Sequence, residues 1–214
     1  MPESASAPSE SVSDALMNKP FSQACENNQA PIAGVLARVF SQAHRILEIG
    51  SGTGQHAVFM AQRMPHLRWQ ASDRSENLPG INQWLTEAAL ANLPPALALD
   101  AAWSTWPACA FDGLFSANTA HIMPWPTVCN MIVKAGALLP PEGRFALYGP
   151  FNYKGEFTSE SNRRFDLYLK QAAAHQGLRD FEKLDGIADK AGLTLEEDNP
   201  MPANNRLLVW RKAV

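Results

Sequence analysis

The sequence contains few cysteines, no long apolar run and no block of like charges. Its three cysteines, Cys25, Cys109 and Cys129, are far apart and without CxxC spacing, which excludes a disulfide framework and a cysteine-rich zinc site, so we expect reduced thiols. No apolar stretch approaches the ~20 residues that cross a bilayer, so no membrane span is expected. The formal charge is −3 and the longest basic run is the pair Arg163-Arg164, which argues against a nucleic-acid partner.

Residues 1–17 are rich in Ser, Ala, Pro and Glu and contain too little apolar surface to fold alone, so we expect a flexible N-terminal tail. The same segment has neither a basic start nor an apolar stretch, which argues against a secretory signal and favours a cytoplasmic protein. Residues 18–214, in a chain that is 46% hydrophobic, are enough for a single α/β domain with a substantial core. We therefore expect one site, and the sequence does not indicate the oligomeric state.

Strand and helix patterns alternate along this domain. Short apolar strands are predicted at 45–49, 68–72, 96–99, 111–117, 144–148, 193–196 and 206–210. Helical spacing of apolar residues predicts a helix that begins near Ile32 and further helices at 54–64, 81–89, 127–139, 162–175 and 181–191. The segments 150–162 and 200–205 are predicted to be loops. The alternation predicts a Rossmann-like α/β fold, with a mostly parallel sheet and helices on both faces.

The most specific motif is Leu47-Glu48-Ile49-Gly50-Ser51-Gly52-Thr53-Gly54, an apolar strand that ends in a G-x-G-x-G turn and leads into a helix. Glycines are needed there because the backbone turns tightly and a side chain would occupy the space that a ligand needs. Asp73 closes the next predicted strand, where a carboxylate can accept hydrogen bonds from both hydroxyls of a ribose. The motif therefore predicts a nucleoside-containing cofactor beyond the end of the first strand.

Two details favour S-adenosylmethionine (SAM) over a dinucleotide. The dinucleotide motif G-x-G-x-x-G would place its third glycine at position 55, where this chain has Gln55. Glu48, two residues before the first glycine, suits a ligand that carries an ammonium and a sulfonium group, and it would repel a pyrophosphate. The alternative is that Glu48 is an ordinary residue at the end of a strand.

These residues resemble the class I SAM-dependent methyltransferases, and the resemblance extends along nearly the whole domain. The segments that are similar to the methyltransferase-like family DUF938 are ENNQAPI (26–32), LEIGSGTGQHAVFMAQRMP (47–65), WQASDRSEN (69–77), ANTAHIMPW (117–125), LYGPFNYKGEFTSESNRRFD (147–166) and MPANN (201–205). The resemblance implies a seven-stranded sheet whose last strand is antiparallel. It also implies that SAM, with S-adenosylhomocysteine (SAH) as its product, lies across the carboxyl ends of the first strands. It supplies no substrate.

The resemblance also implies which residues bind the cofactor. They are Asn28, Glu48, Gly50, Ser51, Gly52, Gly54, Asp73, Asp100 and Asn118. The glycines would line the methionine and ribose, Asp73 would hold the ribose hydroxyls, and Asp100 would face the adenine amino group unless it is a helix cap or a loop acid. Asn118 would lie against the methionine. The polar segment 26–28, ahead of the first predicted helix, is expected to close over the ligand.

A sulfonium methyl group is already activated, so the reaction needs neither a nucleophile from the protein nor a metal ion, and neither is expected. A base is required only when the acceptor carries a proton. The candidate base is His121, which would give an acidic limb near pH 6.5 in the rate profile; its alternative role is a hydrogen bond to the backbone. The candidates for contact with the acceptor are Tyr148, Asn152, Tyr153, Asn204 and Asn205.

The acceptor is expected to be a small molecule that the sequence does not identify. The Asn-Pro-Pro-Tyr tetrapeptide typical of methylation at base amino groups is absent, and residues 117–121 read Ala-Asn-Thr-Ala-His instead, so DNA adenine methylation is not expected. Two alternatives stay open. One is a SAM- or SAH-binding module without catalysis, and the other is an NAD(P)-dependent oxidoreductase, although no Tyr-x-x-x-Lys pair is present.

Overall fold

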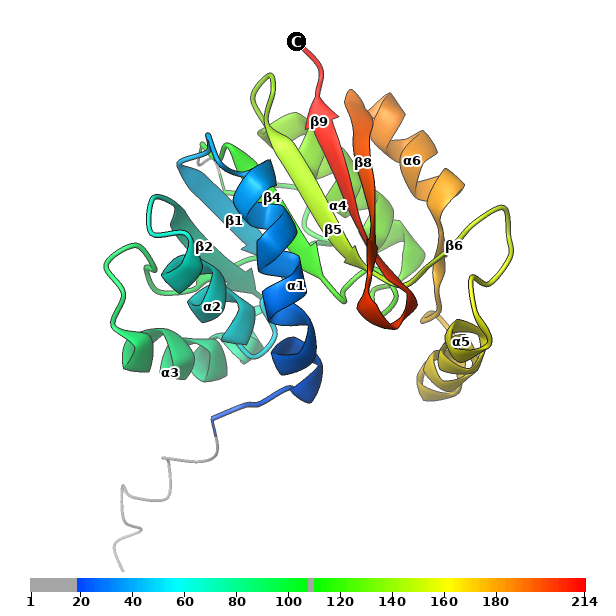
Figure 1. Ribbon diagram of the computed structural model, residues 1–214, viewed down its shortest axis with the longest axis horizontal. Coiled ribbons are helices and arrows are strands. Elements are labelled where there is room, and N and C mark those ends of the chain that lie inside the picture. The colour runs from blue at the N-terminus through cyan, green and yellow to red at the C-terminus, as the bar shows by residue number, and fades with distance from the viewer. Residues whose placement is uncertain (1–18, 108–109) are drawn as a thin grey trace, which may run out of the picture.

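A seven-stranded sheet in the order β3-β2-β1-β4-β5-β9-β8 forms the centre of the computed structural model, which describes residues 19–107 and 110–214 (Figure 1). The strands are β1 (Arg45–Ile49), β2 (Arg68–Asp73), β3 (Leu97–Ala98), β4 (Gly113–Ala117), β5 (Arg144–Gly149), β8 (Leu193–Met201) and β9 (Asn205–Lys212). Strand β9 runs antiparallel to both of its neighbours, β5 and β8, while β1 to β5 pair in parallel. The expected sheet is confirmed, and the tail 1–17 and Cys109 lie outside the described residues.

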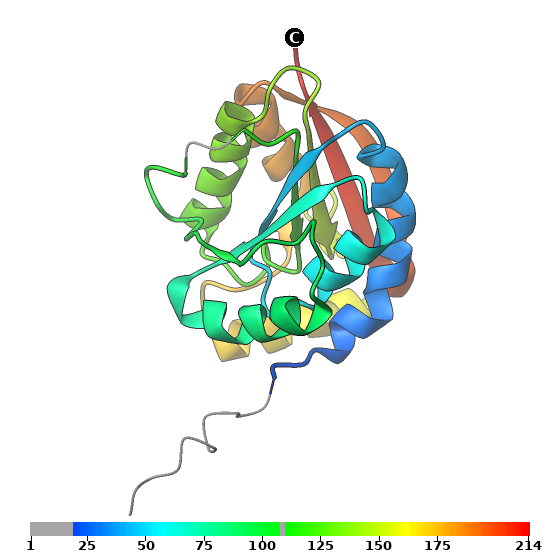
Figure 2. The ribbon, with the colours of Figure 1, turned by 90° about the vertical axis from the view of Figure 1, so that its left-hand side faces the viewer.

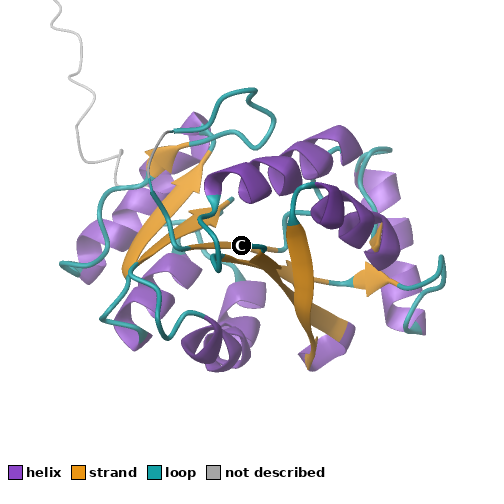
Figure 3. Ribbon diagram, turned by 90° about the horizontal axis from the view of Figure 1, so that it is seen from above, coloured by secondary structure: helices purple, strands orange, loops and turns teal. Residues whose placement is uncertain are grey.

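Helices cover both faces of this sheet, as Figures 2 and 3 show. Helices α1 (Gln23–Val39), α2 (Gln55–Arg63) and α3 (Leu78–Ala88) share one face, α4 (Trp125–Leu138) and α6 (Phe181–Lys190) share the other, and α5 (Glu160–Ala172) lies beyond the carboxyl edge (Figure 1). Side chains alternate along each strand, so Ile46 packs under α1 and α2 while Leu47 packs under α4. No helix in the described ranges is long and apolar enough to cross a bilayer.

Helix α1 begins at Gln23, nine residues before the predicted start near Ile32. The prediction failed because it rested on the apolar stripe that begins at Ile32, whereas the first turns of the helix are mostly polar and Pro31 lies inside it. The true start is capped by Ser22, whose side chain accepts a hydrogen bond from the Cys25 backbone N–H. The segment 26–28 is therefore part of a helix, which corrects the expectation of a separate lid ahead of it.

Both predicted loops contain strands. In the first, β6 (Phe151–Asn152) pairs in parallel with β7 (Arg179–Asp180), and helix α5 starts two residues earlier than predicted. In the second, β8 continues through Pro200 to Met201, which an edge strand tolerates because its outer N–H groups have no partner strand. Only the short turn η3 (Pro202–Asn204) separates β8 from β9. These elements bring the end of β8 to the carboxyl edge of the sheet.

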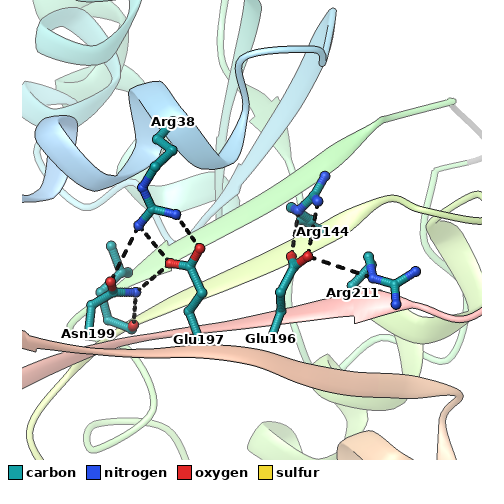
Figure 4. A network of polar contacts seen from close by, with 7 residues as sticks. Arg38, Arg144, Glu196, Glu197, Asn199 and Arg211 are labelled. Carbon is teal, nitrogen blue, oxygen red and sulfur yellow. Dashed lines mark hydrogen bonds and ion pairs between the residues drawn. The ribbon is translucent and has the colours of Figure 1, made fainter.

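A network of ion pairs closes the opposite edge, where the parallel strands begin (Figure 4). A bulge in β8 after Leu195 places two adjacent carboxylates over this edge. Glu197 forms a bidentate ion pair with Arg38 of α1. Glu196 forms one with Arg144 of β5, with N–O distances of 2.7 and 3.1 Å. The network joins α1, β5 and β8 far from the glycine loop.

Candidate functional site

The glycine loop joins β1 to α2 in a conformation that favours glycine at three positions. Gly50, Gly52 and Gly54 have φ values of +73°, +59° and +90°. The backbone N–H groups of Gly50 and Ser51 both donate to the Ser72 carbonyl oxygen, at 3.0 and 2.9 Å, so β2 fixes the start of the loop. The sequence prediction of a strand, a tight turn and a helix is confirmed.

The three glycines differ in what surrounds them. A Cβ atom on Gly50 would lie 2.6 Å from the Thr119 side chain, and one on Gly54 would lie 3.2 Å from the Ile81 backbone oxygen. These two glycines are needed for packing within the protein. A Cβ atom on Gly52 would meet no described protein atom within 4 Å. The space above Gly52 is therefore open to a ligand that approaches the backbone.

Asp73 lies beside this space at the end of β2. Its Oδ2 accepts a hydrogen bond from the Gly52 N–H at 2.8 Å, and its Oδ1 accepts one from the Asn77 side chain at 2.8 Å and one from the Arg74 N–H. A carboxylate offers about four acceptor positions, so capacity remains for a ligand donor. Asp73 thus holds the shape of the loop and offers an acceptor next to Gly52.

Glu48 does not face the ligand space, which corrects the expectation of an open carboxylate. Its side chain is buried, accepts a hydrogen bond from Trp69 Nε1 at 2.8 Å and contacts the Ser51 side chain. Burial raises the pKa of Glu48 to about 7, although the hydrogen bonds from Trp69 and Ser51 act in the other direction. The expected repulsion of a pyrophosphate is therefore weak, and Ser51, whose Oγ accepts from the Ser72 N–H, also points inward.

The pKa of Glu48 leads to a stability prediction. Because the folded-state pKa lies near 7 and the ordinary value is 4.5, the native state holds an extra proton between these values, and this group destabilises the fold as pH rises through that window. Glu48→Gln keeps an oxygen for Trp69 and does not titrate. Its free energy of unfolding, measured with urea relative to the parent, should increase by about 3 kcal/mol from pH 4.5 to pH 7.5. A difference that is independent of pH would contradict the buried carboxyl.

A chain of buried polar contacts runs from α2 through α1 to β5. His56 Nε2 lies 2.7 Å from Asn28 Oδ1, and the side chains of Asn28 and Asn205 lie near the Tyr148 hydroxyl. The Cys25 sulfur lies 3.9 Å from His56 Nδ1. Asn28 is thus a buried link between helices. Tyr148 is buried as well, and burial raises its pKa.

Asp100 follows β3 and Asn118 follows β4, two strands that β2 and β1 separate in the sheet. Asp100 Oδ1 accepts a hydrogen bond from the Ala102 N–H at 2.8 Å, so it caps a turn, which is the alternative role expected for this residue. Asn118 has a φ of +58°, and its N–H donates to the Tyr148 carbonyl oxygen at 2.9 Å. This backbone turn places Thr119 against Gly50. Contact of either side chain with a cofactor remains a prediction.

His121 is buried where the loop after β4 meets α5. Its ring lies edge-on to Phe165, with centroids 5.4 Å apart, and a Cβ atom on Gly149 would lie 3.7 Å from its Nδ1. Burial and the nearby Arg179 guanidinium lower the pKa of His121 to about 4. The expected acidic limb near pH 6.5 is therefore corrected to about pH 4, and the imidazole is neutral at pH 7.

Three of the five expected acceptor residues line one pocket of about 400 Å³ at the same edge of the sheet. Its lining consists of Tyr153, Thr158, Pro200, Met201, Asn204, Asn205 and Arg206. The Tyr153 hydroxyl donates to Asp198 at 2.8 Å, and Arg206 Nε donates to the same carboxylate at 2.7 Å. Asn152 lies next to this pocket with its Oδ1 buried and without a partner among the described residues. The structure thus brings together Tyr153, Asn204 and Asn205.

Sequence reasoning missed several residues that shape the site. One of them is Gln55, which the sequence singles out only because it is not a glycine. Gln55 ties α1 to the loop, since its Oε1 accepts a hydrogen bond from the Ser22 N–H at 2.6 Å and its Nε2 donates one to Glu26. Its buried place at the start of α2 is not visible in the sequence. Thr158, Met201 and Arg206 reach the pocket only through the β8–β9 turn, where the sequence predicts a longer loop.

The strand order, the single antiparallel strand and the glycine loop after β1 define the Rossmann-like fold of the methyltransferase class. An O-methyltransferase family protein from Burkholderia thailandensis superposes with a TM-score of 0.77 and 17% identity, over 86% of this chain and 56% of that one. An O-methyltransferase family 2 protein from Planctomyces limnophilus, solved in complex with apigenin, gives 0.76 and 22%, over 87% and 57%. A methyltransferase in calicheamicin biosynthesis, solved in its SAH-bound form, gives 0.66 and 14%, over 86% and 55%.

These similarities show the fold, and the chain spans just over half the length of each of the three structures. The particular family follows from the sequence itself. The chain belongs to the family described as "Protein of unknown function (DUF938)", whose profile matches residues 19–212.

Proposed function

We propose that this protein binds SAM at the glycine loop and transfers its methyl group to a small-molecule acceptor. The observation that carries the proposal is the open space above Gly52, bordered by the Asp73 carboxylate. The family membership, the fold and the similarity to a methyltransferase solved with bound SAH support it. Several of the similar structures are O-methyltransferases by name, which favours an oxygen acceptor.

The residues present fit such a cofactor. Gly52 would allow the backbone to approach it, and Asp73 would accept hydrogen bonds from its ribose hydroxyls. When bound, SAM would supply the methyl group from its positively charged sulfur, and the rest of the cofactor would leave as SAH. The protein then has to hold the acceptor oxygen in line with the methyl group and exclude water.

The acceptor side of the proposal rests on the carboxyl ends of β4 and β5, where a parallel sheet presents its ligands. His121 is neutral at pH 7 and is therefore able to accept the acceptor proton as the new carbon–oxygen bond forms, before it passes that proton to solvent. Tyr153, Asn204 and Asn205 would hold the part of the acceptor away from the reacting oxygen.

The purified protein should bind SAM and SAH more tightly than NAD, because the dinucleotide motif has a third glycine, which lets the helix pack closely on the strand, at the position that Gln55 occupies here. Gln55 is buried and hydrogen-bonded to Ser22 and Glu26, so it has no freedom to move aside. Calorimetric titrations with each ligand measure the difference. Tighter binding of NAD would refute the proposal and favour an oxidoreductase.

Asp73→Ala should weaken SAH binding at least about tenfold, because hydrogen bonds to a carboxylate are worth about 1.5–3 kcal/mol. The change also removes the acceptor of the Gly52 N–H, so the melting temperature should fall. Asp112→Ala is the matched control: Asp112 accepts from the His44 and Arg45 N–H groups at the opposite edge, at 2.7 and 2.8 Å. It should lower the melting temperature and leave SAH affinity unchanged. Equal affinities in both variants would show that Asp73 does not touch the cofactor.

A SAM-binding module without catalysis would share the loop and Asp73 but would form no product. Incubation with SAM and pooled metabolites, followed by mass spectrometry for SAH and for products heavier by one methyl group, separates the two. SAM binding without SAH formation across metabolite pools would favour the module.

A further inference from the structure

Helix α5 buries two polar side chains and leaves two aromatic ones exposed. Of its three buried residues, Asn162 and Asp166 are polar, whereas the rings of Phe165 and Tyr168 are 36% and 66% exposed as whole residues and stack with centroids 6.5 Å apart. A surface helix normally buries its apolar stripe. Here the polar side chains attach the helix, and the aromatic side is left available.

The polar side fixes α5 at two places on the carboxyl edge. Near its start, Asn162 Nδ2 donates to the Asn204 carbonyl oxygen at 3.1 Å. Farther along, Asp166 Oδ1 accepts from the Leu178 N–H at 2.8 Å, and the neighbouring Gly177 N–H donates to the His121 carbonyl oxygen at 3.0 Å. The helix therefore contacts both the β8–β9 turn and the loop that carries His121, and Figure 1 shows it beyond the carboxyl edge of the sheet.

One aromatic residue of this side, Phe165, lies at the reacting end of the proposed site. Ser161, Phe165 and Tyr168 lie on one flank, since residues three and four positions apart are neighbours on a helix. Phe165 contacts the His121 ring, and His121 follows Thr119, which packs on Gly50. Leu167, 49% exposed, lies on the other flank of the same helix. Phe165 thus lies beside the loop after β4, the same loop that packs on the glycine loop through Thr119.

The pocket at the other end of α5 carries no free charge among its described lining residues. Arg206, which is charged, is paired with Asp198, and the same carboxylate accepts from the Tyr153 hydroxyl. The remaining lining groups are amides, a hydroxyl, a thioether and a proline ring. A charged ligand group would be left unpaired there, which is costly, whereas a neutral group would find hydrogen-bond partners.

The span between the two ends sets a length. The pocket lies at β8 and β9, and His121 follows β4, so β5 and β9 lie between β4 and β8 in the sheet. Two to three strand spacings of about 4.8 Å each amount to about 10 to 14 Å. A ligand that reaches from one end toward the other is elongated, about the length of two linked rings.

Building on the proposed function, we propose that the acceptor is an elongated, uncharged aromatic molecule with a hydroxyl group, one ring packing on Phe165 and the far end lying in the Tyr153–Asn205 pocket. A phenol suits the neutral His121, because a weak base removes a proton more readily from an acidic hydroxyl than from an aliphatic alcohol.

Three probes of matched shape test this proposal: 4-phenylphenol, its non-aromatic analogue 4-cyclohexylcyclohexanol, and the anionic 4'-hydroxybiphenyl-4-carboxylate. Each is titrated calorimetrically into protein saturated with SAH. We expect 4-phenylphenol to bind most tightly. Phe165→Ala and Phe165→Leu should weaken it about three- to tenfold, the range for loss of an aromatic contact, while Leu167→Ala should change it less than about twofold.

The variants separate failure of this proposal from failure of the proposed function. If SAH itself does not bind the parent, the proposed function fails. If SAH binds and 4-phenylphenol does not, or binds no better than either analogue, the acceptor class is wrong. Equal affinity in the Phe165 variants and in Leu167→Ala would remove Phe165 from the site. Phe165→Leu keeps an apolar side chain at this position. If Phe165→Ala does not fold, the affinity of Phe165→Leu for 4-phenylphenol still tests the proposal.

Discussion

His121→Ala and His121→Gln are expected to lower turnover by about 10²–10⁴-fold while SAH affinity stays nearly unchanged, because a positioned base contributes that much to proton removal. The lowered pKa fixes the pH dependence. The imidazole is the proton acceptor only above its pKa, so parent activity should fall as pH drops through about 4, not 6.5. The charged group that acts on His121 is Arg179, whose guanidinium donates to three backbone carbonyls of the surrounding loops.

Rates of methyl transfer to any acceptor found, measured from about pH 3.5 to about pH 8 on protein confirmed to be folded at each pH, check this expectation. His66→Ala is the matched control, since His66 lies near the opposite edge and contacts the Phe40 carbonyl oxygen at 3.4 Å. A structural role for His121 would lower the melting temperature, and an altered acceptor pose would raise KM. If both variants turn over at the parent rate and keep the acidic limb, His121 is not the base.

Gly52→Val should weaken SAH binding by about 1–3 kcal/mol, or roughly 5- to 150-fold, because its side chain would fill the space assigned to the ligand. The variant carries a second cost, since a β-branched residue is strained at a φ of +59°. Calorimetry gives the affinity and thermal unfolding gives the strain.

Gly155→Val separates these two costs. Gly155 has a φ of +77° and, like Gly52, has no described atom within 4 Å of the position that a Cβ atom would take, but it lies in the turn after Tyr153. Both variants should lose similar thermal stability, and only Gly52→Val should lose SAH affinity. Comparable affinity in the two variants would mean that the space above Gly52 is not the cofactor site.

The sheet and the glycine loop can be predicted from the sequence because both depend on local signals. Short apolar runs identify the strands, and positive φ values select glycine at positions 50, 52 and 54. Asp73 is identified for the same reason, as the residue that ends β2.

The acceptor side depends on contacts between distant segments, which local signals do not show. Glu48 looks like a free carboxylate in the sequence because nothing there indicates that Trp69 lies over it. The pKa of His121 follows from its burial beside Arg179, far along the chain. Phe165 escapes sequence reasoning because two of the three buried residues of α5 are polar, contrary to the usual rule for a surface helix.

The bulge in β8 determines where this strand tolerates a change in length. Leu195 pairs with Trp210 and Glu197 pairs with Val209, so Glu196 is the extra residue. Loss of Glu196 alone would leave every later pairing in place, with Asp198 still beside Arg206 and Tyr153. Loss of any one residue from 198 to 201 would instead shift the register by one residue. The side chains on one side of the gap, up to the bulge or up to the turn, would then move to the opposite face of the sheet. Relatives that differ in length along this strand should therefore have their gap at position 196.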